Sequence, residues 1–61
     1  MLTYDDVQYI VGSAQYYHDI TVVLLNGDVY SFKRDKGRLD SHFIELEHLY
    51  IPYSAIATIS F

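Results

Sequence analysis

The 61-residue chain lacks cysteine and tryptophan, contains one proline, and carries only four lysine or arginine side chains. The lack of cysteine excludes disulfides and thiolate metal sites, and it suits a reducing compartment. No apolar run approaches the roughly 20 residues that span a bilayer, and the first residues lack the basic region of a signal peptide. We therefore expect a cytoplasmic protein that makes no membrane contact.

The length predicts a single domain over residues 1–61. Folding at this size buries only about 60% of the surface that the unfolded chain exposes, so a lone core is marginal. Apolar residues make up 51% of the chain, with seven tyrosines and three phenylalanines. This content is too high for disorder and high enough to place some aromatic side chains between subunits. We therefore expect a homo-oligomer.

Positive charge is confined to one short stretch, residues 33–38. Its four cations and Asp35 give a charge of +3, and the seven other carboxylates give the rest of the chain −7. A molecule polarised in this way can steer an anion to one place and repel it elsewhere. Gly37 within this stretch marks a turn or a bulge.

The N-terminal residues predict a helix over about residues 4–17. Thr3 suits the N-cap, and Asp5 and Asp6 in the first turn complement the helix dipole. An apolar face follows with the spacing i, i+3, i+4, i+7, formed by Val7, Ile10, Val11 and Ala14. Gly12 is compatible with two interpretations, a tolerated cost of about 1 kcal/mol or a close approach to another backbone.

Two runs of strand-forming residues, about 20–25 and 28–34, flank Asn26-Gly27. Both residues of a type I′ turn need a positive φ, which Asn and Gly tolerate, so this pair predicts a two-residue hairpin turn. Such a turn places Leu24 opposite Val29. The first run is apolar on both faces, which predicts a helix over one face and sheet closure or a partner over the other.

Short strands also dominate the second half of the chain. Alternation begins at Ser41 and changes parity near Glu47-His48, which predicts a tight turn or a bulge there. Pro52 cannot donate a ladder hydrogen bond, so it ends a strand or lies at an edge. Residues 52–55 suit a short 3₁₀ turn, and residues 56–61 suit a last strand.

The order of these elements, and two segments in particular, resemble the Sm-like family. Residues 22–30 look like the first hairpin of that family, and residues 51–59 look like its closing segment. The resemblance implies a mainly β fold with one N-terminal helix, in which a small five-stranded SH3-like barrel covers about residues 20–61. It also implies rings in which the fourth strand of one subunit pairs with the fifth of the next. The implied interface residues are Leu49, Tyr50, Ile51, Ala57, Ile59 and Phe61.

Two RNA-contact motifs of the family are not matched. The loop over residues 40–43 supplies Asp40 and an aromatic residue but no asparagine, and Pro52-Tyr53-Ser54 contains no cation. A nucleic-acid contact would therefore use the basic stretch and nearby rings, and not the family's uridine motif. The candidate residues are Lys33, Arg34, Lys36, Arg38, His42 and Tyr53.

No motif in the sequence indicates an enzyme, a cofactor or a metal site. A nucleophile elbow, a phosphate-binding glycine loop and triad spacing are all missing. His42 and His48 are six residues apart, about 20 Å in an extended chain, which is too far for a shared metal ion. Two functional classes stay open. The first is a ring that binds RNA or single-stranded nucleic acid, and the second is a protein-interaction or scaffold oligomer.

Overall fold

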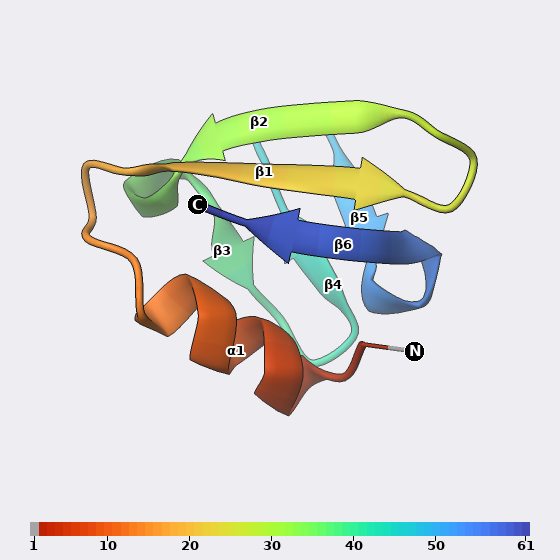
Figure 1. The fold of residues 1–61 in the computed structure, drawn as a ribbon, viewed down its shortest axis with the longest axis horizontal. Coiled ribbons are helices and arrows are strands. Elements are labelled where there is room, and N and C mark those ends of the chain that lie inside the picture. The colour runs from red at the N-terminus through yellow and green to blue at the C-terminus, as the bar shows by residue number, and fades with distance from the viewer. Residues whose placement is uncertain (1) are drawn as a thin grey trace.

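A computed structural model describes residues 2–61, which form one helix, six short strands and two 3₁₀ turns (Figure 1). The elements are α1 (Tyr4–Gly12), β1 (Asp19–Leu24), β2 (Val29–Lys33), η1 (Arg34–Lys36), β3 (Arg38–Leu39), β4 (Phe43–Glu45), β5 (Tyr50–Pro52), η2 (Tyr53–Ala55) and β6 (Ile56–Ser60). The strands form two three-stranded antiparallel sheets, in the orders β2-β1-β6 and β3-β4-β5. The predicted mainly β fold with one N-terminal helix is confirmed.

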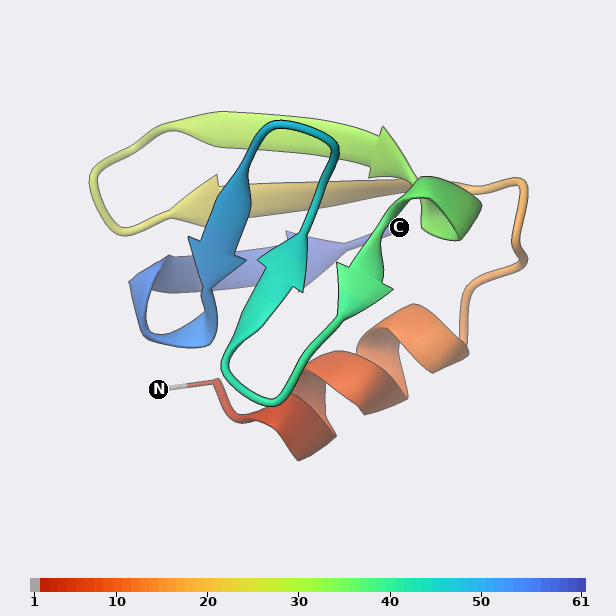
Figure 2. The ribbon, with the colours of Figure 1, turned by 180° about the vertical axis from the view of Figure 1, so that it is seen from behind.

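The number of strands differs from the prediction, since the structure has six and the sequence predicted five. The predicted second strand stops at Lys33, where η1 begins, and a separate strand β3 follows it in the other sheet. Among residues 2–61 no strand pairs with both sheets, so the arrangement is not a closed barrel of paired strands. Figure 2 shows the sheet β3-β4-β5 lying across the sheet β2-β1-β6.

The helix begins as predicted and ends five residues earlier than predicted. The Thr3 side chain accepts a hydrogen bond from the Asp6 N–H, and the Asp6 carboxylate accepts one from the Thr3 N–H, which completes a capping box. After Gly12, the Ser13 hydroxyl donates to the Tyr9 carbonyl over 2.8 Å. The capping box satisfies orphan backbone N–H groups at the start of this short helix, and the Ser13 hydroxyl is a second donor to a carbonyl that the Ser13 N–H also reaches.

The hairpin between β1 and β2 exists, but its predicted register is wrong by one residue. Val23, not Leu24, lies opposite Val29. The loop has three residues, and of its members only Gly27 has a positive φ, at 94°. The Gly27 N–H donates to the Leu24 carbonyl over 2.9 Å, as in a type I turn followed by a left-handed glycine.

The physical reason for the longer loop lies in the neighbours of the turn. The Leu25 N–H donates to the Ala55 carbonyl over 2.9 Å, so Leu25 is held beside the start of β6 and does not pair with Asp28. The Asn26 side chain accepts from the Asp28 N–H over 2.9 Å. An Asx interaction of this kind stabilises the turn without a positive φ at Asn26.

The second sheet confirms the predicted turn near Glu47-His48. The Leu46 N–H donates to the Leu49 carbonyl over 2.7 Å and closes a two-residue loop between β4 and β5. Pro52 ends β5 at the edge of its sheet, and η2 follows, both as predicted. Gly37, expected in a turn or bulge, is extended, with φ −104° and ψ 132°.

The core lies between the two sheets, and α1 packs across the opening between them (Figure 1). Most of its buried members alternate along the strands or lie on one helix face, and Ala14 and Tyr53 come from the segment after α1 and from η2. The buried members are Val7, Val11, Ala14, Ile20, Val22, Ile44, Ile51, Tyr53 and Ile56. Ile20 and Val22 therefore point inward on β1, whereas Val29, opposite Val23, is 59% exposed. Within residues 2–61 no element covers the outer face of this sheet, so covering of that face by a partner stays a prediction.

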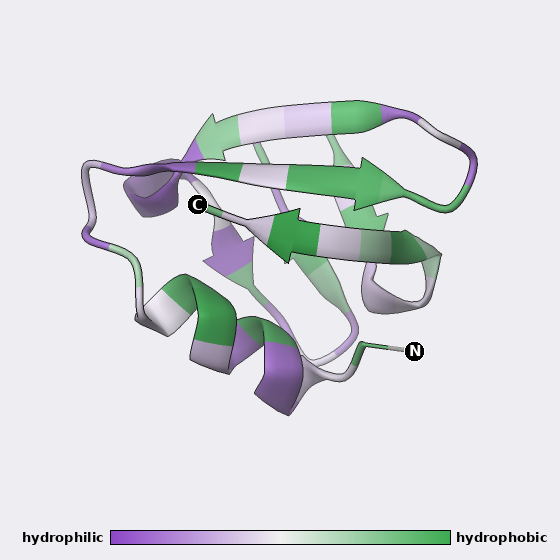
Figure 3. Cartoon of the chain, in the orientation of Figure 1, coloured by the Kyte–Doolittle hydropathy of each residue, from purple (hydrophilic) through white to green (hydrophobic). Residues whose placement is uncertain are grey.

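Hydropathy follows the same division, with apolar residues concentrated in the sheets and hydrophilic residues at the helix start and in η1 (Figure 3). No helix within residues 2–61 has the length and apolar character needed to cross a membrane.

Candidate functional site

Two of the four cations have structural partners. Lys33 forms an exposed ion pair with Asp19, with 3.2 Å between Nζ and Oδ1. Arg34 is half-buried, and its Nε donates to the Val11 carbonyl over 2.7 Å. Its backbone N–H donates to the His18 carbonyl over 3.0 Å. Arg34 thus joins η1 to the end of α1 and to the segment before β1.

The other two cations, Lys36 and Arg38, are exposed. Neither forms an ion pair within residues 2–61. Arg38 lies opposite Glu45 in the β3–β4 register, so its charge has a carboxylate on the neighbouring strand. Lys36 lies in η1, which is hydrophilic along its length (Figure 3). The basic stretch therefore offers a smaller free positive surface than its four cations predict.

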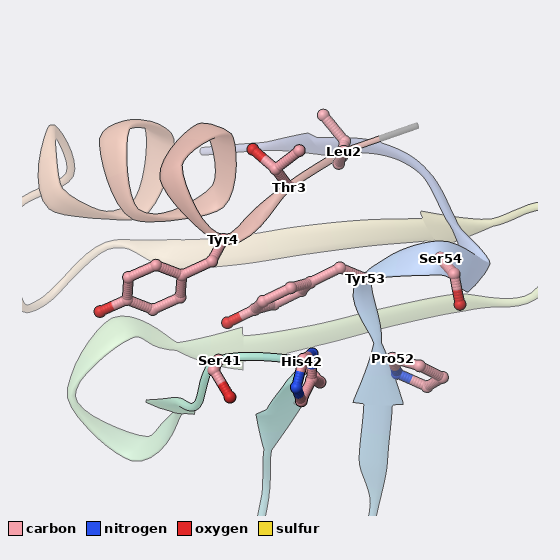
Figure 4. A pocket seen from close by; sticks show the side chains of 8 residues that line it. All are labelled: Leu2, Thr3, Tyr4, Ser41, His42, Pro52, Tyr53 and Ser54. Carbon is pink, nitrogen blue, oxygen red and sulfur yellow. The ribbon is translucent and has the colours of Figure 1, made fainter.

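The structure brings His42 and Tyr53 together at the opposite end of the second sheet. The Tyr53 N–H donates to the His42 carbonyl over 3.0 Å. Both residues line an open cavity of about 370 Å³, whose wall also includes the start of α1 (Figure 4). The lining residues are Leu2, Thr3, Tyr4, Ser41, His42, Pro52, Tyr53 and Ser54.

Tyr53 is a wall of this cavity more than a free stacking surface, because only 4% of it is exposed. Its hydroxyl donates to the Asp40 carbonyl, and its ring lies 6.3 Å from that of Tyr4, tilted by 40°. Burial raises the pKa of the Tyr53 phenol, with smaller contributions from Tyr4 and Asp40. The neutral phenol is thus held in place as a hydrogen-bond donor.

The predicted nucleic-acid residues therefore form two groups and not one site. The four cations lie in η1 or close beside it in the chain, whereas His42 and Tyr53 lie at the start of β4 and after the end of β5 (Figure 4). The cavity lining contains no lysine, arginine or carboxylate. It could accept a neutral, partly aromatic group but supplies no lysine or arginine to neutralise a phosphate.

Four of the six predicted interface residues lie on two edge strands, and the other two, Leu49 and Phe61, directly flank these strands. β5 pairs only with β4, and β6 pairs only with β1. Side chains differ along these edges: Tyr50 is 64% exposed and Phe61 57% exposed, whereas Ile51 is buried in the core. Ala57 is exposed, and Leu49 and Ile59 are half-buried. The Ile51 side chain is therefore not available for an interface, and its backbone lies opposite Ile44 of β4.

Sequence analysis missed one exposed cluster, at residues 16–18 and 61. Tyr16 and Tyr17 were assigned to the helix, but they follow its end and are 67% and 60% exposed. Their rings continue through His18 to Phe61. The sequence did contain one signal for this cluster, because the two adjacent tyrosines follow a Gly-Ser pair that can end a helix.

Within residues 2–61, no group of three or more metal-ligating side chains lies close enough to hold an ion. His48 lies 3.6 Å from Glu47, and both side chains are almost fully exposed. Comparison of the chain with models of protein families, with curated proteins and with solved structures gave no match.

Proposed function

We propose that the chain is a non-enzymatic, homo-oligomeric binding module of the Sm-like type, whose subunits join by strand addition. In this proposal the two sheets are the halves of an SH3-like barrel, and β2 and β3 are two parts of one bent strand interrupted by η1. The order of elements supports it, since a helix, a hairpin, a second sheet and a 3₁₀ turn precede the last strand.

The observation that carries the proposal is the open edge on β5 and on β6. In an antiparallel pair, the backbone N–H and C=O of every second residue bond to the neighbouring strand. The backbone groups of the residues between them point away from that strand. The Tyr53-to-His42 and Leu46-to-Leu49 bonds fix this alternation in β5, so the N–H of Tyr50 points away from β4. β5 therefore presents free backbone groups to a neighbour.

The same reasoning applies to β6. The Leu24 N–H donates to Asp28 in the hairpin, so Leu24 and Val22 bond toward β2, and Val23 bonds toward β6. Thr58 is the partner of Val23, so the backbone N–H and C=O of Thr58 face β1. Those of Ile59 face the open edge. Unpaired edges are templates for pairing with another chain, and a domain of this size gains from the added burial.

A proline in the free edge tests this arrangement. We expect Tyr50→Pro to convert the oligomer to a monomer of 7.1 kDa, because it removes an N–H that points away from β4. The matched control is Ser31→Pro, an exposed position whose N–H points away from β1 on the opposite edge, β2. Circular dichroism would establish that both variants fold. Equal masses for the two variants would contradict the proposed interface.

A second candidate function is binding of single-stranded nucleic acid at the η1 end. It is favoured by the exposure of Lys36 and Arg38 without ion pairs in the described chain. Repetition around a symmetry axis would turn a small patch into a larger one. The competing class is a protein-interaction oligomer that binds no nucleic acid.

Salt dependence separates these two classes. Binding of an oligothymidylate should weaken as the salt concentration rises. The logarithm of the binding constant should fall with the logarithm of the salt concentration, with a slope near −0.7 for each phosphate contacted. We expect the double change Lys36→Gln and Arg38→Gln to weaken binding and flatten the slope while leaving mass and melting unchanged. If the parent does not bind at low salt, or if the double change alters assembly, the protein-interaction class is favoured.

A further inference from the structure

A row of four adjacent rings lies at the end of the molecule that carries η1. We call it the aromatic row, and its members are Tyr16, Tyr17, His18 and Phe61. Ring centroids are 5.8 Å apart for the two tyrosines and 4.8 Å apart for Tyr17 and His18, both edge to face. His18 and Phe61 are stacked at 5.8 Å with an interplanar angle of 19°.

The backbone beneath the aromatic row is fixed by hydrogen bonds. The His18 N–H donates to the Gln15 carbonyl over 3.0 Å, and the Gln15 N–H donates to His18 Nδ1 over 3.2 Å. The His18 carbonyl accepts from the Arg34 N–H over 3.0 Å. A tight turn joined to η1 therefore presents Tyr16 and Tyr17 to solvent, at 67% and 60% exposure.

All cations of the chain lie in the stretch that begins beside this row. Lys33 pairs with Asp19, the residue directly after His18, and η1 bonds to His18 itself. Both ribbon views place the segment before β1, η1 and the C-terminal end of β6 at the same end of the molecule (Figures 1 and 2). Exposed rings and the lysine and arginine side chains therefore occur at the same end of the molecule, whereas the cavity around Tyr53 is lined by no such cation.

We propose that the aromatic row is a base-stacking platform for single-stranded nucleic acid, with the exposed Lys36 of η1 contacting phosphates next to it. Every base has a π-face, so stacking on exposed rings needs no particular sequence, and adjacent cations hold the backbone. This inference rests on the nucleic-acid function proposed above and moves the base contact from Tyr53 to residues that the sequence analysis did not choose. The platform requires only one subunit, and of its four members only Phe61 is also among the candidate interface residues, directly after β6.

The test compares tyrosines inside and outside the row. Binding of a labelled oligothymidylate at low salt would be measured for the parent, for Tyr16→Leu with Tyr17→Leu, and for the control Tyr9→Leu. Tyr9 is 79% exposed on α1 and is not a member of the row. We expect the double change to weaken binding by about tenfold, as for the loss of a stacked base, with an unchanged salt slope. Tyr9→Leu should bind as the parent does.

Tyrosine fluorescence gives a direct readout, because the chain contains no tryptophan. Added oligothymidylate should quench the emission of the parent and of Tyr9→Leu, and it should quench the double variant far less. A merely structural role of Tyr16 and Tyr17 would change melting, but it would not remove this quenching selectively.

The outcomes distinguish the inference from the function on which it rests. If the parent binds and the double change Lys36→Gln and Arg38→Gln weakens binding, but the loss of Tyr16 and Tyr17 does not, the function stands and the platform is overturned. If the parent does not bind at low salt, both fail. A change in subunit number on loss of the two tyrosines would show that the row contacts a second copy, and it would also overturn the inference.

Discussion

The three glycines of the chain have different surroundings, so the same substitution should have different effects. A Cβ at Gly12 would meet nothing within 4 Å, which favours the tolerated-cost interpretation of this helical glycine. A Cβ at Gly37 would collide with the Phe32 ring. Gly27 has open space but a φ of +94°, which L side chains rarely adopt. The effect of a substitution therefore depends on the space around the Cβ at Gly37 and on the backbone conformation at Gly27.

We predict that Gly12→Ala raises the free energy of unfolding by up to about 1 kcal/mol, because alanine is the better helix former. Gly37→Ala should lower it by about 1–3 kcal/mol through overpacking, and Gly27→Ala by about 1–2 kcal/mol through left-handed strain. Urea unfolding at one fixed protein concentration measures all three, since the stability of an oligomer, as proposed above, would depend on concentration. Destabilisation by Gly12→Ala would indicate an unseen close approach.

Tyr53 gives a prediction for alkaline pH. Burial raises its pKa above the ordinary value of 10.0, so the folded state favours the neutral phenol more than the unfolded chain does. The corresponding stability is complete below about pH 10 and is lost as the pH rises through the folded-state pKa. Tyr53→Phe should therefore flatten the alkaline loss of stability.

The same variant should cost about 0.5–1.5 kcal/mol at neutral pH, because the Asp40 carbonyl loses its donor. Thermal melting of parent and variant across alkaline pH measures both effects. Parallel melting curves for the two proteins at every pH would contradict the assignment of the buried phenol.

At the scale of elements, Arg34 joins η1, α1 and the segment before β1. We predict that Arg34→Gln lowers the free energy of unfolding by about 1–2 kcal/mol, because the Val11 carbonyl loses a charged donor in a half-buried position. Lys36→Gln is the control in the same 3₁₀ turn and should change stability by less than about 0.5 kcal/mol. Equal effects would mean that the Arg34 bond contributes nothing.

The hairpin shows how far local sequence predicts an element. Strand-forming runs around Asn26-Gly27 predicted its presence correctly, because both strands and the turn are set by neighbouring residues. The register depended on a contact between Leu25 and Ala55, which are 30 positions apart in the chain. Such a long-range contact leaves no local signal, so the predicted pairs were shifted by one.

The end of the helix and the candidate site could likewise be predicted only in part, because both depend on packing. The periodic spacing continued to Ala14, which is buried although the helix ends at Gly12. Sequence predicted His42 and Tyr53 as candidates, and η2 and the β3–β4 loop bring them together, but the burial of Tyr53 depends on packing. The aromatic row was missed because His18 and Phe61 are distant in sequence.

At the scale of the whole molecule, charge and edges suggest a division of surfaces. The lysine and arginine side chains and the aromatic row occur at the η1 end. The unpaired edges of β5 and β6 each lie along one of the two sheets (Figures 1 and 3). Assembly through backbone edges would leave the η1 end available in every subunit. This division links the oligomer proposed here to a repeated binding surface.

Sedimentation equilibrium of the unmodified protein tests the central proposal most directly. A closed ring joined by strand addition predicts one species, several times the 7.1 kDa subunit mass, that persists at micromolar concentration. Strand addition through β5 predicts that this mass falls to that of one subunit for Tyr50→Pro and not for Ser31→Pro. A folded 7.1 kDa monomer at micromolar concentration would contradict the account.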